Sequence, residues 1–219
     1  MGSEAEMQAI VDAVARYFQA ATDDDLRNTA IVRDDLQRYG EALIPMGLAY
    51  LAHSLQQTAR ETMLVFLADE QAGDAFVVEQ GNAMASKLRS LVRAYGEMGV
   101  TTLLKTLRFT DEDTVALAAY MLADQGFVRP SSVAQLRLAL DGAYGTACRL
   151  ALALALYRHG DRQWFERLAQ QFLMKQPGTS PEALERAARS VFNVLALDIV
   201  SNGQAYSGPS RSEWARKQY

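Results

Sequence analysis

Leucine and alanine alternate strictly from Leu150 to Leu156, which is the two-residue period of a half-buried β-strand. Both residues are nevertheless strong helix formers and poor strand residues. Helical patterns stand on both sides of the run, and a helix that is apolar around its whole circumference belongs at the centre of a bundle. The sequence therefore predicts a buried helix here, ended by Gly160, with Asp161 capping the next helix.

Apolar residues at helical spacing, together with residues typical of helix ends, recur along the rest of the chain. Gly81 is expected to interrupt a helix over residues 74–99. The other expected helix starts are Ser3 with Glu6 as a capping box, Thr22, Thr110 and Ser180 with Pro181, and Pro45 is expected either to start or to kink a further helix. The other expected helix ends are Gly40, Gly73, Gly126 and Gly203.

Strand signals are weak, since no Asn-Gly or Asp-Gly turn lies between two alternating β-branched runs. The predicted fold is all-α, a compact bundle of about eight to ten helices with an extended C-terminal arm. We expect one helical domain over residues 1–203, either undivided or in lobes 1–98 and 99–203, and an arm over residues 204–219.

Hydrophobic residues make up 49% of the 219-residue chain, so a large core is available. No stretch approaches the roughly 18 consecutive apolar residues that a membrane helix needs, and no signal-peptide pattern opens the chain. We expect no membrane partner and a location in the cytoplasm or in an assembled particle. The net charge of −4 is unevenly spread: residues 1–79 carry a balance of −9 and residues 80–219 a balance of +5.

Residues with catalytic or metal-binding potential are few. Cys148 is expected to be a core thiol, His53 a core or boundary residue, and His159 a cation at a helix C-terminus. No zinc pattern, phosphate loop or catalytic triad order is present. The acidic runs 23–25 and 111–113 could pair around a metal ion, but acidic residues are expected at helix starts in any case. We expect no enzyme activity, no cofactor and no metal site.

Basic residues cluster with aromatic ones in the second part of the chain. Cations that track a phosphate backbone, mixed with rings that stack on bases, are typical of sequence-tolerant single-strand binding. Arginines on the polar face of any helix give the same pattern. The candidate nucleic-acid-binding residues are Lys87, Arg89, Arg93, Lys105, Arg108, Arg158 and Arg162.

The last residues resemble an arm, rich in Gly, Ser and Pro and then in aromatic and basic residues. Trp214 and Tyr219 are candidates for self-association, because a neighbouring copy could receive their rings. The first functional hypothesis is therefore a self-assembling protein that packages nucleic acid, like a nucleocapsid or filament coat subunit. A helical protein–protein adaptor is the second hypothesis, and a helical bundle that binds a small molecule is the third.

Overall fold

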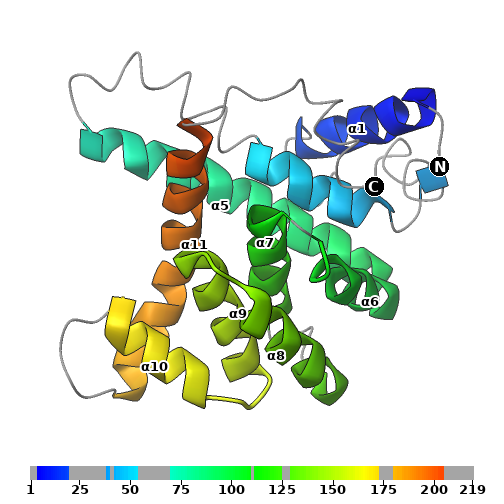
Figure 1. Cartoon of the computed structure of the whole chain (residues 1–219). Helices are drawn as coiled ribbons and strands as arrows, with labels where there is room; N and C mark the ends of the chain where they lie inside the picture. Colours follow the sequence, from blue (N-terminus) through cyan, green and yellow to red (C-terminus); the bar gives the residue numbers. More distant parts are fainter. Residues whose placement is uncertain are drawn as a thin grey trace. The chain divides into compact units, whose positions relative to one another are not determined.

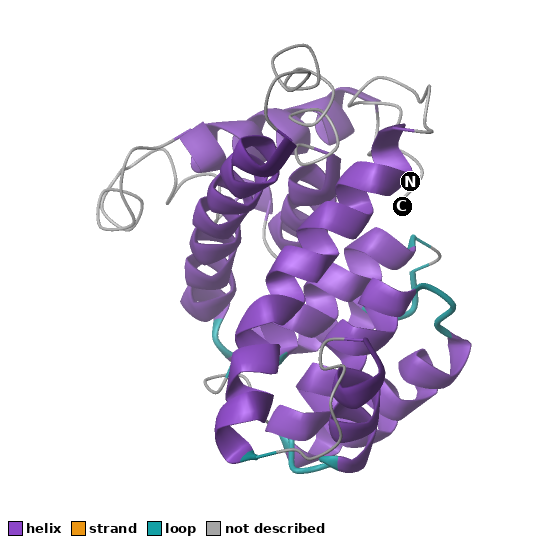
Figure 2. Cartoon of the chain, turned by 90° about the vertical axis from the view of Figure 1, so that its left-hand side faces the viewer, coloured by secondary structure: helices purple, strands orange, loops and turns teal. Residues whose placement is uncertain are grey.

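The computed structural model describes residues 4–19, 38–39, 42–53, 70–109, 111–124, 129–172 and 180–204. These residues are helical or lie in short connections, and none of them forms a strand (Figure 2). The all-α prediction is confirmed for this part of the chain. The chain divides into two compact units: unit 1 comprises residues 1–102 and 200–219, and unit 2 comprises residues 103–199. The predicted arm falls almost wholly outside the described residues, because the last described residue is Gln204.

Unit 1 contains α1 (Glu4–Gln19), a helical segment over residues 43–53, α5 (Glu70–Tyr95) and the first part of α6 (Glu97–Thr106). Residues 43–49 are all buried. Between α5 and α6, Gly96 adopts a φ of 57°, a left-handed conformation that glycine takes without steric cost. On α5 the buried side chains recur at helical spacing, namely Ala85, Leu88, Leu91 and Val92.

Two of the expected helix limits in unit 1 are wrong. Helix α5 already begins at Glu70, so it runs through Gly73 rather than starting after it. The helix also continues without interruption past Gly81. A single glycine weakens a helix by only about 1 kcal/mol, which the remaining contacts of a 26-residue helix can offset. The expected helix start at Thr22 and the expected helix ends at Gly40 and Gly126 lie outside the described residues.

The core of unit 2 is α9 (Thr146–Arg158), the helix that contains the alternating leucines and alanines. Every residue from Leu150 to Leu156 is buried, with at most 3% of its surface exposed, so the predicted buried helix is confirmed. Figure 1 shows α9 beside its neighbours, and it packs against α7 (Glu112–Leu122), α8 (Val133–Gly142) and α10 (Gln163–Phe172).

The alternating sequence explains this central position. Successive leucines in α9 are two residues apart, so each is turned by about 200° around the helix axis from the one before. Leu150 and Leu154 therefore point one way, while Leu152 and Leu156 point almost the opposite way. A helix with leucines on opposite sides must be covered on both, and the alanines between them allow close approach of the neighbouring helices.

The last helix, α11 (Pro181–Gln204), belongs to unit 2 up to residue 199. It begins as the sequence predicts, since the hydroxyl of Ser180 accepts the backbone N–H of Ala183 at 3.2 Å. The ring of Phe192 packs on Tyr120 of α7, with 5.0 Å between centroids. Arg158 of α9 pairs with Glu185, with 3.3 Å between Nη2 and Oε2. These contacts join α11 to both α7 and α9.

The corner between α9 and α10 has the geometry of a Schellman motif. The N–H of Asp161 donates to the carbonyl of Leu156 at 2.8 Å and the N–H of Gly160 to that of Tyr157 at 3.1 Å. Gly160 has a φ of 96°, as its predicted place after the helix requires. Asp161 does not cap α10, which begins at Gln163. Its carboxylate instead accepts the Nε–H of Arg137 on α8 at 2.8 Å.

Candidate functional site

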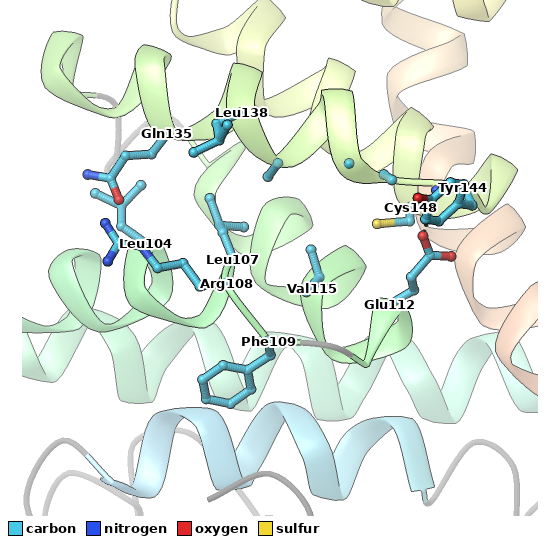
Figure 3. Close-up of a pocket in the computed structure, with 13 residues that line it drawn as sticks. Leu104, Leu107, Arg108, Phe109, Glu112, Val115, Gln135, Leu138, Tyr144 and Cys148 are labelled. Carbon is cyan, nitrogen blue, oxygen red and sulfur yellow. Dashed lines mark hydrogen bonds between the residues drawn. The ribbon is translucent and has the colours of Figure 1, made fainter.

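A cavity of about 400 Å³ lies inside unit 2, between α8, the end of α6 and the start of α7 (Figure 3). Small-molecule sites are typically clefts of about 300–1,000 Å³, lined by apolar side chains with a few polar groups that orient the ligand. This cavity is partly open to solvent and has a lining of that kind. Its apolar side chains are Leu104, Leu107, Phe109, Val115, Leu138, Ala139, Ala143 and Cys148.

Helix α8 packs into the core of unit 2 through one face, and another face of the helix lines the cavity. Leu136 and Leu140 are its buried residues. Leu138 lies between them in sequence and points elsewhere, so that it lines the cavity while 73% of its surface remains exposed. Its exposed surface is one that a bound molecule could cover.

Glu112 defines one end of the cavity. Its carboxylate accepts two backbone N–H groups, that of Tyr144 at 2.6 Å and that of Gly145 at 2.9 Å. Gly145 is the N-cap residue of α9 and offers no side-chain cap of its own. The first turn of α7 thus supplies the anion that caps α9, where the helix dipole favours a negative charge.

Arg108 and Gln135 lie together at the other end of the cavity, whereas Tyr144 and Cys148 lie beside Glu112 (Figure 3). The backbone N–H of Arg108 donates to the carbonyl of Lys105 at 3.1 Å, so a tight turn after α6 holds the residue in place. The side chain is exposed, and its guanidinium has no ion-pair partner among the described residues.

Cys148 is buried, with 3% of its surface exposed, as the sequence predicts for a core thiol. It also lines the cavity, which the sequence did not indicate. Since the chain has a single cysteine, chemical modification of Cys148 reports on access to this cavity alone.

The predicted nucleic-acid-binding residues are divided between the two units. Lys87, Arg89 and Arg93 lie on α5 in unit 1. Lys105 lies on α6, Arg108 in the turn that follows it, Arg158 at the end of α9 and Arg162 just before α10, all in unit 2. Lys87, Arg89, Arg93 and Lys105 each take part in further polar contacts.

The aromatic ring of Tyr157 is flanked by two of the predicted cations. The guanidinium of Arg162 lies 5.5 Å and that of Arg158 5.9 Å from the ring centroid of Tyr157. The same ring is half-buried and packs on Phe165, with 5.3 Å between centroids. Arg158 is also engaged by Glu185, so part of its charge is already balanced.

His159 has a structural role that the sequence did not predict in full. It is the C-cap residue of α9, as its position implied. Its Nδ1 lies 3.1 Å from the backbone nitrogen of Arg129 and 2.9 Å from the carbonyl oxygen of the same residue. Its Nε2 lies 3.2 Å from the carbonyl oxygen of Leu122. The neutral Nε2–H tautomer satisfies the Arg129 N–H and the Leu122 carbonyl together, which ties the end of α7 to the α9–α10 corner.

The acidic residues at the start of α7 act in helix capping. Asp111, rather than the expected Thr110, is the N-cap residue, and its carboxylate accepts the N–H of Thr114 at 2.9 Å. Across the described ranges, no three His, Cys, Asp or Glu residues are grouped so as to hold a metal ion. Residues 23–25, Trp214 and Tyr219 lie outside the described residues.

No protein-family model, curated protein or solved structure matches this chain. Within the described residues, no helix is long and apolar enough to span a membrane.

Proposed function

We propose that this protein is a helical bundle that binds a small molecule in the cavity of unit 2. The observation that carries the proposal is the cavity itself: about 400 Å³, lined mainly by apolar side chains, with polar groups at its two ends. Burial of apolar surface provides most of the affinity in such sites, and the polar groups set the orientation of the ligand.

A neutral fluorescent probe, N-phenyl-1-naphthylamine, tests this proposal without assuming a ligand charge. We expect saturable binding with increased fluorescence. Ala139→Phe should weaken it, because Ala139 lines the cavity and a larger side chain there occupies the space. Ala134→Phe is the matched control, since Ala134 is exposed on the same helix and does not line the cavity.

Cys148 provides a second readout that needs no substitution. A saturating concentration of the probe should slow the reaction of Cys148 with a maleimide, since the thiol lines the same cavity. Non-saturable fluorescence, or saturable binding that leaves the maleimide rate and the Ala139→Phe variant unaffected, would show that the cavity is not the binding site.

Binding of single-stranded nucleic acid is a second candidate function, favoured by the position of Arg158 and Arg162 beside the Tyr157 ring. Binding to a labelled single strand should then weaken with salt by a log–log slope of about 0.7 per phosphate contact. Arg158→Gln with Arg162→Gln should reduce that slope, whereas Arg167→Gln, at an exposed position on α10, should not. Absence of binding at low salt would exclude this candidate. We rank it second because Glu185 already balances part of the charge of Arg158.

A further inference from the structure

The two ends of the cavity differ in charge, and this difference identifies a ligand class. The inference rests on the proposed small-molecule function of the same cavity. Arg108 and Gln135 stand at one end and the Glu112 carboxylate at the other (Figure 3).

The Arg108 end is suited to an anionic group. A guanidinium presents a planar set of N–H donors that matches the two oxygens of a carboxylate. The guanidinium of Arg108 has no ion-pair partner in the part of the chain that the structure describes. The side-chain amide of Gln135, at the same end, can donate a further hydrogen bond.

The Glu112 end disfavours an anion. Its carboxylate already accepts the N–H groups of Tyr144 and Gly145, so those donors are occupied and the negative charge stays in place. A second negative group brought to this end would meet the like charge of Glu112, and the two backbone N–H groups there are already engaged.

The middle of the cavity is apolar. Leu107, Val115 and Leu138 line it from three different segments. Leu138 is 73% exposed, so an alkyl or aromatic group placed against it removes apolar surface from water.

We propose that the cavity binds amphipathic monocarboxylates, with the carboxylate on Arg108 and Gln135 and the apolar body against Leu107, Val115 and Leu138. A dicarboxylate of the same length places its second charge beside Glu112 and binds more weakly. Neutral molecules of the same length lose the contact with Arg108.

Displacement of bound N-phenyl-1-naphthylamine from the full chain tests the proposal, with decanoate, decanol and the ten-carbon dicarboxylate as probes at neutral pH. Decanoate should displace the dye about tenfold better than either of the other two, a modest factor because Arg108 is exposed. The preference should fall as salt is added, because exposed charges are screened.

The charge of Arg108 should carry this preference. Arg108→Gln should abolish it and Arg108→Lys should keep part of it, with the displacement of each variant compared at that variant's own measured affinity for the dye. Arg167→Gln removes a positive charge from an exposed position outside the cavity and should leave the preference unchanged.

The outcomes separate this inference from the function on which it rests. If the dye does not bind in the cavity, the small-molecule function itself fails. If the dye binds but decanoate displaces it no better than decanol, or keeps its advantage in Arg108→Gln, the cavity binds small molecules and the monocarboxylate assignment is wrong.

Discussion

Gly145→Ala should destabilise unit 2 although the backbone there suits alanine. Gly145 has φ −68° and ψ 138°, an extended conformation open to any residue. An added Cβ would lie 2.7 Å from Oε2 of Glu112, which is too close for the carboxylate to stay in place. Glu112 must therefore shift, which weakens its two backbone hydrogen bonds at the start of α9.

The magnitude follows from those two bonds. A hydrogen bond to a charged group contributes about 1.5–3 kcal/mol, and partial exposure of Glu112 lowers this to about 1 kcal/mol for each bond. Alanine restricts the unfolded chain and so adds about 0.4–1 kcal/mol of stability, but it is a poorer N-cap residue than glycine by a similar amount. The net loss in the free energy of unfolding should be about 1–2 kcal/mol.

Urea unfolding followed by the fluorescence of Trp164 on α10 measures this loss within unit 2. A Trp214→Phe background removes the only other tryptophan. Gly142→Ala is the matched control, because a Cβ there meets nothing within 4 Å. It should raise stability by about 0.4–1 kcal/mol, because Gly142 ends α8 in a helical conformation that alanine can adopt and alanine restricts the unfolded chain.

A double-mutant cycle decides whether Glu112 is the cause. In a Glu112→Ala background the carboxylate is gone, and Gly145→Ala should cost close to nothing. If Gly145→Ala costs the same with and without Glu112, or is as stabilising as Gly142→Ala, the proposed capping of α9 by Glu112 is refuted.

Two further predictions concern the core and the pH dependence of stability. Leu154→Asp places an unpaired charge at a site that is 3% exposed and should lower the free energy of unfolding by about 3–5 kcal/mol. Leu138→Asp, at a site that is 73% exposed, should lower it little. Similar melting temperatures for the two variants would contradict the central burial of α9. Burial raises the pKa of Tyr95 from 10.0 to about 12, so its neutral form stabilises the fold below pH 10 and this contribution is lost as the pH rises towards 12. Tyr95→Phe should flatten this part of the dependence of unfolding free energy on pH, and an unchanged slope would count against burial as its cause.

The features of the fold that could be predicted from the sequence are those that depend on residues close together in the sequence. The composition of residues 150–156 outweighs their two-residue alternation, because leucine and alanine favour helix wherever helical segments flank them. Ser180 and Pro181 start α11, and Gly160 ends α9, because each acts on backbone groups only a few residues away. Gly73 and Gly81 misled the same reasoning, since one glycine does not end a helix by itself.

The cavity was not predictable because its lining residues are far apart in sequence and ordinary in type. Arg108 was predicted to contact nucleic acid because Lys105 and Phe109 lie close to it in sequence. Its place opposite Glu112 depends on how α6, α7 and α8 pack, which local patterns do not encode. Gly145 was the one available signal, because a glycine before a helix can mark a close approach by another segment.

Glu112 fits the preference for acidic residues in the first turn of a helix, but its main contact is with backbone groups distant in sequence. An acid in the first turn of α7 is expected from the helix dipole alone, and that sufficed to explain it in the sequence. In the structure the same carboxylate accepts the N–H groups of Tyr144 and Gly145, more than 30 residues away in sequence, at the start of the central helix α9. Removing it should therefore affect both the stability of unit 2 and the charge of the cavity, which is why Glu112→Ala serves only in the unfolding cycle with Gly145→Ala and the probe series is measured on variants of Arg108.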